Sequence, residues 1–202
     1  MSGTLVLVRH GEIVRPLYTS NFDRAALSTY GETQIRALAK AWPAGRPSAV
    51  YTSPLRRGVE SAQVLANAFG RSITKRSCLR EWSADDSGIP QDEYKALERR
   101  AWADFDLVPP SRESLSQATT RVRECLEEIG EATEGSTAAV VGHGSLFSLL
   151  TASLKGDRPT EAYKDSIQFA SAATVAIGSD LRLIRDFRSY GTPSPPSRNP
   201  RR

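Results

Sequence analysis

The chain of 202 residues contains two histidines, and both stand in the same local setting. His10 lies two positions after the apolar run Thr4–Val8, and a glycine follows it. His143 lies two positions after the apolar run Thr137–Val141, and a glycine follows it as well. Such short apolar runs are typical of buried parallel strands, and ligands bind beyond the carboxyl ends of these strands. The sequence therefore predicts that both imidazoles lie at one edge of a sheet and form one site.

Two arginines are expected at the same edge. Arg9 directly precedes His10 at the end of a buried strand, where a guanidinium is costly unless an anion meets it. Arg57 closes the segment Ser53–Arg57, which follows a second short strand and opens a helix. A helix N-terminus also attracts anions. Two arginines and two histidines around one point make an anion pocket of the kind that binds phosphate.

A metal site would need a different pattern. A metallohydrolase could use His10, His143 and Glu81 as three ligands. The sequence has no short-spaced ligand pair such as His-x-x-x-His, however, and Arg9 and Arg57 would repel a cation. We therefore expect a site without a metal ion and an activity without a cofactor.

The elements that must position these residues alternate along the chain. Helical spacing of apolar residues predicts helices, and short apolar runs predict strands. Gly178–Asp180 is typical of a hairpin turn between the last two strands. The expected helices are Gly31–Trp42, Arg56–Phe69, Tyr94–Phe105, Ser114–Ala132 and Ser145–Leu154. The expected strands are Thr4–Val8, Ala49–Tyr51, Ile73–Leu79, Thr137–Val141, Ala172–Ile177 and Leu181–Ile184. This order predicts an α/β three-layer sandwich, with helices on both faces of a mostly parallel sheet and the final hairpin at or near an edge.

Composition limits the domain organisation and the partners. The length suits one domain, which we place at residues 1–190. The net charge of +4 comes from the four arginines after Asp186, because residues 1–187 carry 23 basic and 23 acidic side chains. A neutral body argues against a nucleic-acid surface. The segment 191–202 is rich in Pro, Ser and Arg and is expected to be disordered.

The same composition bears on the location of the protein. No apolar run approaches the roughly 18–20 residues that a membrane span needs, and no signal peptide is recognisable. We therefore expect a cytosolic protein that does not bind membranes, and the sequence leaves its oligomeric state open. Two cysteines in such a chain are expected to pack as small apolar groups rather than to form a disulfide. These are Cys78 and Cys125.

Five blocks of sequence, in this order and spacing, resemble the histidine phosphatase superfamily, also called the phosphoglycerate mutase-like family. The blocks are Leu7-Val8-Arg9-His10-Gly11-Glu12, Leu27-Ser28 with Gly31 and Gln34, Tyr51–Arg57 running to Ser61-Ala62, Leu79-Arg80-Glu81, and Val141-Gly142-His143-Gly144. The triplet Arg-His-Gly alone recurs by chance, whereas all five blocks together are specific. The resemblance extends from Thr4 to about Asp186.

The resemblance implies a role for each residue of the predicted anion pocket. In that family the first histidine, here His10, is a nucleophile that becomes phosphorylated. Arg9, Arg57 and His143 correspond to the groups that hold the phosphoryl oxygens. Glu81 corresponds to the carboxylate that protonates the leaving oxygen. The implied activity is hydrolysis of a small phosphomonoester, which agrees with the positioning and cationic stabilisation that phosphoryl transfer requires.

Some features of the site stay open at this stage. Asp85 or Asp86 could replace Glu81 as the proton donor. Many members of the family carry an asparagine six residues after the nucleophile, where this chain has Pro16, and the next asparagine is Asn21. The loop after Glu12 is therefore expected to be remodelled. The residues expected at the mouth of the site are Arg15, Tyr18 and Trp82.

Two other functions are compatible with the same residues. A phosphoglycerate mutase would share His10 but keep water out, and dedicated mutases tend to be longer than this chain. A protein that binds a phosphorylated ligand without catalysis would need the anion pocket alone. The sequence does not name the phosphate ester.

Overall fold

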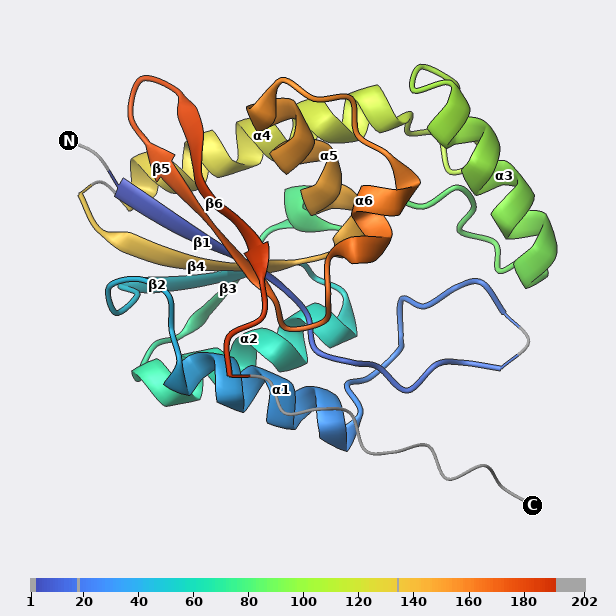
Figure 1. Cartoon of the computed structure of the whole chain (residues 1–202). Helices are drawn as coiled ribbons and strands as arrows, with labels where there is room; N and C mark the ends of the chain where they lie inside the picture. Colours follow the sequence, from blue (N-terminus) through green and yellow to red (C-terminus); the bar gives the residue numbers. More distant parts are fainter. Residues whose placement is uncertain (1–2, 18, 134, 192–202) are drawn as a thin grey trace.

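A computed structural model describes residues 3–17, 19–133 and 135–191 of the chain (Figure 1). The strands are β1 (Gly3–Arg9), β2 (Ala49–Thr52), β3 (Ile73–Lys75), β4 (Thr137–Gly142), β5 (Ala172–Ile177) and β6 (Leu181–Arg188). The helices are α1 (Thr29–Lys40), α2 (Arg56–Phe69), α3 (Gln91–Ala103), α4 (Leu115–Ala132), α5 (Gly144–Lys155) and α6 (Glu161–Ser166), with a 3-10 turn, η1, at Ser77–Leu79.

The strands form one sheet in the order β3-β2-β4-β1-β5-β6. The pairs β1/β4, β2/β4 and β2/β3 are parallel, whereas β5 runs antiparallel to β1 and to β6. The register aligns Arg9 at the end of β1 with Gly142 at the end of β4. The two predicted histidine positions therefore follow neighbouring strands at the same level of the sheet, and the hairpin β5–β6 occupies one edge, as predicted.

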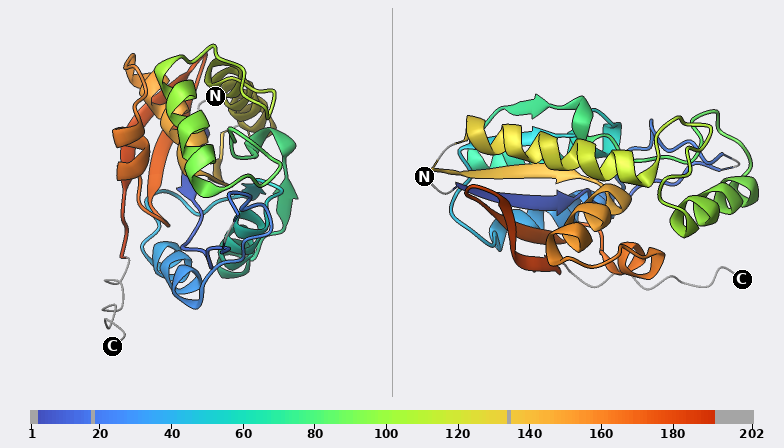
Figure 2. Two further views of the ribbon diagram at one scale, coloured as in Figure 1. Left: turned by 90° about the vertical axis from the view of Figure 1, so that its right-hand side faces the viewer. Right: turned by 90° about the horizontal axis from the view of Figure 1, so that it is seen from above.

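Helices cover both faces of the sheet, which confirms the predicted three-layer sandwich (Figure 1). On one face, α1 and α2 pack on β1, β2 and β4 through a core that contains Ile35, Leu38 and Leu65. On the other face, α4 and α5 enclose a second core that contains Leu126 and Phe147. The helix α3 lies beyond the carboxyl ends of the parallel strands rather than on a face, as the view from above shows (Figure 2).

The structure corrects the bounds of two predicted strands and adds one helix. The expected strand Ile73–Leu79 ends at Lys75, because the chain turns there into η1. The last strand runs to Arg188 instead of ending at Ile184. The sequence did not indicate α6, whose six residues are too few to show a helical period. The clearest agreement is α4, where the Ser114 hydroxyl accepts a hydrogen bond from the Gln117 N–H and starts the helix as a capping box.

The two cysteines form a disulfide, which contradicts the expectation that they pack as free thiols. Cys78 of η1 and Cys125 of α4 lie 47 positions apart in the sequence, and their Cα atoms are separated by 5.8 Å. The expectation was wrong because the pairing depends on how α4 packs against η1, which local sequence does not reveal.

Two expectations concern the ends and the surface of the chain. The predicted disordered tail lies, except for Gly191, outside the described residues. Among the described residues no helix has the length and apolar character that crossing a bilayer requires.

Candidate active site

The carboxyl ends of β1, β4 and β2 bring the predicted pocket residues together. The backbone N–H of His10 donates to the carbonyl oxygen of Gly142, 3.0 Å away, which fixes the loop after β1 against the end of β4. The imidazole rings of His10 and His143 then lie with their centroids 5.2 Å apart. Arg57 follows β2 as the second residue of α2. Because the connections from β1 and β4 lead to helices on opposite faces, the two histidines mark a switch point of the sheet, where ligands of such folds bind.

His10 is buried, and the hydrogen bond of its ring determines its tautomer. Its side chain is 5% exposed. The ring Nδ1 lies 2.8 Å from the carbonyl oxygen of Gly11, which can only accept, so Nδ1 carries the proton. Burial, reinforced by the positive charges of Arg57 and Arg9, lowers the pKa of His10 well below 6.5, although the bond to Gly11 opposes this shift. The ring is therefore neutral near pH 7, with a free electron pair on Nε2.

His143 lies deeper than His10 and is fully buried at the start of α5. Burial again lowers its pKa well below 6.5, and the charges of Arg57 and Arg9 act in the same direction. Both ring nitrogens lack a hydrogen-bond partner among the described residues. Buried polar groups are normally hydrogen-bonded, so both nitrogens are free to bind a polar group that reaches them.

Each of the two arginines is held by a backbone carbonyl group. Arg9 donates from Nη1 to the carbonyl oxygen of Ile167, and its guanidinium carbon lies 4.3 Å from the centre of the Phe169 ring. Its Nε is buried without a partner within the described part of the chain. Arg57 donates from Nη1 to the carbonyl oxygen of Phe22, 2.6 Å away. Burial lowers the pKa of both guanidinium groups and Glu81 opposes this most, but arginine stays charged at neutral pH.

Glu81 reaches the same pocket from the irregular segment after η1. Its Oε2 accepts from the Ser145 N–H at 3.1 Å, and its Oε1 accepts from the Leu146 N–H at 3.0 Å. These are the second and third residues of α5, so the carboxylate sits on a helix N-terminus. A third N–H, from Trp82, also donates to Oε1 at 3.0 Å.

A cavity of about 240 Å³ opens in front of these groups. Its lining combines Arg9, His10, Arg57 and Glu81 with residues of α3, α6 and the loops beside them, whereas His143 is fully buried and is not one of the lining residues. The lining residues are Arg9, His10, Ile13, Arg15, Phe22, Arg57, Glu81, Trp82, Gln91, Tyr94, Lys95, Glu98, Gly144, Ser145, Lys164, Asp165 and Phe169. The sequence interpretation missed Phe169, whose ring centre lies 5.5 Å from that of His10. It precedes β5, which runs antiparallel to β1 and therefore begins where the parallel strands end. The apolar pattern alone does not give this direction, so the sequence carried no signal for Phe169.

The alternative proton donors lie away from the cavity that His10 lines. The carboxylate of Asp85 accepts from the N–H and the hydroxyl of Ser87, and the hydroxyl bond in particular lowers the pKa of Asp85. Asp86 is exposed, and its carbonyl oxygen accepts from the side chain of Asn21. Asn21 therefore holds the loop after β1 against the loop 83–89 and does not line that cavity.

The three residues expected at the mouth have different outcomes. Arg15 and Trp82 line the cavity. Trp82 is only 2% exposed, and its Nε1 donates to the carbonyl oxygen of Glu113, so it is chiefly a packed residue. Tyr18 lies outside the described residues. The described ranges contain no group of three or more His, Cys, Asp or Glu side chains placed to hold a metal ion.

The pattern of neutral histidines, arginines and one carboxylate at a sheet edge agrees with a family match. Residues 5–187 match the family described as histidine phosphatase superfamily, branch 1. The chain belongs to the histidine phosphatase superfamily. The match runs from β1 to β6 and includes all of the candidate site residues discussed above.

Relatives of this chain carry two kinds of name. It is 27% identical to a 2,3-bisphosphoglycerate-dependent phosphoglycerate mutase of Brucella anthropi, over 89% of the chain and 95% of the mutase. It is 24% identical to a Bacillus subtilis protein named uncharacterized phosphatase PhoE, over 90% and 92% of the two chains. Among solved structures it resembles phosphoserine phosphatase from Entamoeba histolytica in complex with 3-phosphoglyceric acid. That likeness has a TM-score of 0.76, 20% identity and coverage of 93% and 97%, and it shows the fold. The family therefore acts on phosphate groups, as hydrolases and as mutases.

Proposed function

We propose that this protein hydrolyses small phosphomonoesters through a phosphohistidine on His10. The observation that carries the proposal is the hydrogen bond from Nδ1 of His10 to the Gly11 carbonyl oxygen. This bond fixes the tautomer with the electron pair on Nε2, and burial beside Arg57 and Arg9 keeps the ring neutral. A neutral imidazole held in this way is a competent nucleophile toward phosphorus.

The remaining groups fit the two halves of the reaction. Arg9, Arg57 and His143 bind the phosphoryl oxygens, whose charge grows in the transition state. Nε2 of His10 forms a bond to phosphorus as the ester P–O bond breaks, and protonated Glu81 gives its proton to the departing oxygen. A water molecule then attacks phosphorus and gives a proton to the Glu81 carboxylate. The N–P bond breaks, and inorganic phosphate leaves. One carboxyl group thus acts first as acid and then as base.

The outer part of the cavity supports hydrolysis of a monoester rather than mutase chemistry. A mutase that uses a bisphosphate must hold a second phosphate group as well. The two lysines in the outer cavity, Lys95 and Lys164, both pair with the buried carboxylate of Glu98. Lys164 also lies 3.6 Å from the carboxylate of Asp165. The charge of both lysines is therefore already matched within the protein, which leaves Arg15 as the cation of this lining that could meet a second phosphate.

Chain length does not separate the two activities. A mutase was expected to be longer than this chain, but the Brucella anthropi mutase is matched over 95% of its length. Hydrolase and mutase activity must therefore be distinguished by the chemistry of the outer cavity and by assay. The cytosolic location and the absence of nucleic-acid binding stay predictions. The disulfide between Cys78 and Cys125 bears on the predicted cytosolic location, because thiols in the cytosol are mostly kept reduced.

The deciding experiment follows both the intermediate and the products. The protein is mixed with a phosphate-labelled ester and quenched in alkaline detergent, since phosphohistidine is labile in acid. Wild-type protein and His143→Ala should carry label, and His10→Ala should carry none and should not release phosphate. In parallel, 3-phosphoglycerate is supplied with and without 2,3-bisphosphoglycerate. We expect release of inorganic phosphate without isomerisation, with no loss of activity in EDTA and competitive inhibition by vanadate.

Two results would contradict the proposal. Label or full turnover in His10→Ala would exclude a phosphohistidine at that position. Isomerisation that depends on bisphosphoglycerate and exceeds phosphate release would identify a mutase instead.

A further inference from the structure

The segment that carries Glu81 has no regular secondary structure of its own. It follows η1 and precedes the loop 83–90, so neither a strand ladder nor a helix fixes its backbone. The other pocket residues are anchored at ends of the parallel strands or in the helices that follow them. Some other part of the molecule must therefore fix the backbone on both sides of Glu81.

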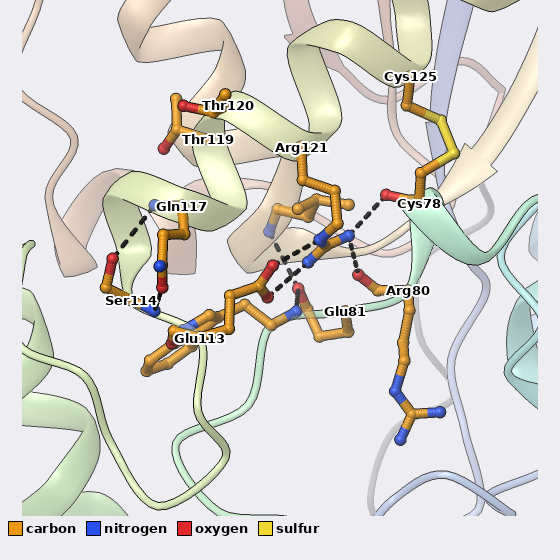
Figure 3. A network of polar contacts seen from close by, with 12 residues as sticks. Cys78, Arg80, Glu81, Glu113, Ser114, Gln117, Thr119, Thr120, Arg121 and Cys125 are labelled. Carbon is orange, nitrogen blue, oxygen red and sulfur yellow. Dashed lines mark hydrogen bonds and ion pairs between the residues drawn. A yellow bond between two sulfur atoms is a disulfide. The ribbon is translucent and has the colours of Figure 1, made fainter.

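Arg121 of α4 supplies this support on the N-terminal side of Glu81. Its Nη1 donates to the carbonyl oxygen of Cys78 at 2.6 Å and to that of Arg80 at 3.0 Å (Figure 3). Arg80 is the residue that directly precedes Glu81. A planar guanidinium can hold two carbonyl oxygens in fixed directions, whereas a lysine ammonium has no such fork.

Glu113, just ahead of α4, completes the support. Its carboxylate binds Arg121 in a bidentate manner, with Nε to Oε1 at 2.6 Å and Nη2 to Oε2 at 2.7 Å (Figure 3). Its carbonyl oxygen accepts from Nε1 of Trp82 at 2.8 Å. The residues on both sides of Glu81 are thus tied to the N-terminal half of α4. The disulfide between Cys78 and Cys125 joins the same two parts of the chain.

The support lies behind the reaction cavity rather than in it. Arg121 and Glu113 line a separate groove and are not among the lining residues of the cavity at His10. By holding the backbone beside Glu81, they fix the position from which its carboxylate accepts hydrogen bonds from the N–H groups of Ser145 and Leu146. Those two N–H groups precede the first intrahelical bond of α5 and have no helical acceptor.

We propose that Arg121, held by Glu113, is a positioning residue that keeps the Glu81 carboxylate at the leaving-group side of the site. The inference rests on the proposed function, because it assumes that Glu81 is the proton donor. A misplacement of about 1 Å can cost on the order of 100-fold in rate, and general acid catalysis is commonly worth about 10²–10⁴-fold. Loss of Arg121 therefore slows esters whose leaving oxygen needs a proton.

The test compares leaving groups in folded variants. Arg121→Met removes the donors and keeps the length of the side chain, Glu113→Gln weakens the fork, and Arg121→Lys restores charge alone. The matched control is Arg76→Met, because Arg76 precedes η1 and pairs with Glu128 of α4 without touching the carbonyl groups near Glu81. Glu81→Gln serves as the reference for complete loss of the acid.

Each variant is assayed for kcat and KM with an alkyl phosphate and with p-nitrophenyl phosphate. We expect Arg121→Met to lower kcat by at least about 10-fold on the alkyl ester and by less than about 3-fold on the nitrophenyl ester. Arg121→Lys should recover only part of the loss, and Arg76→Met should match wild type. A hydrogen-exchange readout uses the peptide 143–150, where Arg121→Met should speed exchange at residues 145 and 146.

The outcomes separate the two proposals. Equal losses on both esters in Arg121→Met, with unchanged exchange at residues 145 and 146, would overturn the positioning role. If Glu81→Gln shows no leaving-group dependence, Glu81 is not the acid and that part of the proposed function fails. The positioning role is then decided by exchange alone, since faster exchange at these amides in Arg121→Met supports it and unchanged exchange overturns it. A variant that does not fold is replaced by Glu113→Gln, which keeps the Arg121 guanidinium that donates to the carbonyl oxygens of Cys78 and Arg80.

Discussion

Replacing Cys78 by alanine removes the disulfide that joins η1 to α4. The two cysteines are 47 positions apart, so the bridge closes a long loop in the unfolded chain. In the loop-closure model a bridge over such a loop stabilises the folded state by about 4 kcal/mol at 25 °C. Cys78 is half-buried, so the lost packing adds little to this figure. For a domain of this size, about 4 kcal/mol corresponds to a fall in Tm of roughly 8–16 °C.

The assay is thermal unfolding followed by circular dichroism, with and without a phosphine reductant. Wild-type protein should melt lower in reductant and approach Cys78→Ala, whereas Cys78→Ala should not respond to reductant at all. Urea titrations should give the matching loss of unfolding free energy. The reasoning is refuted if wild type and variant melt within about 2 °C of each other, a difference too small for a loop of this length. Release of two free thiols by denaturation without reductant would show that the bridge is absent.

Other predictions follow from close approach, burial and charge. Gly31→Ala places a Cβ 2.1 Å from the carbonyl oxygen of Glu12, so the backbone just after His10 must shift. We expect a loss of about 1–3 kcal/mol in urea titrations together with lower kcat, whereas Gly178→Ala, with open space around it, should match wild type in both. Burial and the nearby arginines lower the pKa of both histidines, so the unfolded chain takes up protons before the folded one as the pH falls below about 6.5. The unfolding free energy should therefore fall between about pH 7 and 5, and His143→Gln should reduce that slope by up to about 1.4 kcal/mol per pH unit; an unchanged slope in urea titrations would contradict this. Lys164→Met leaves the buried carboxylate of Glu98 with one partner fewer and should lower the unfolding free energy by about 3 kcal/mol. Replacing both Lys164 and Glu98 by apolar residues should recover most of this loss in the same titrations.

The sequence predicted the part of the site that follows from regular structure. Apolar runs placed β1 and β4, and parallel pairing brought His10 and His143 to the same edge because both follow their strands at the same register. The helix at Arg56–Phe69 was predicted with its observed bounds, because Gly70 adopts a left-handed conformation with φ 63° and ends it. Local rules were sufficient wherever an element carries its own start and stop signals.

The features that escaped prediction depend on contacts between distant segments. Phe169 reaches the site because β5 runs antiparallel to β1, and strand direction is not written in the apolar pattern. The disulfide depends on the packing of α4 against η1. The bonds of Arg121 end on backbone carbonyl groups, which every residue has, so no residue type marks their acceptors. Side-chain to backbone contacts over such separations leave no signal in one sequence.

The site thus combines residues that are fixed by the sheet with one residue, Glu81, on an irregular segment. The groups proposed to bind phosphate sit at the ends of parallel strands, where two cores enclose the sheet and the backbone is fixed by the strand ladders. Glu81 sits on an irregular segment whose position depends on Arg121 and Glu113. Phosphate affinity and leaving-group protonation are therefore separable properties in this molecule. Substitutions on α4 should change which esters are turned over quickly, while the inhibition constants of inorganic phosphate and vanadate stay close to those of the wild type.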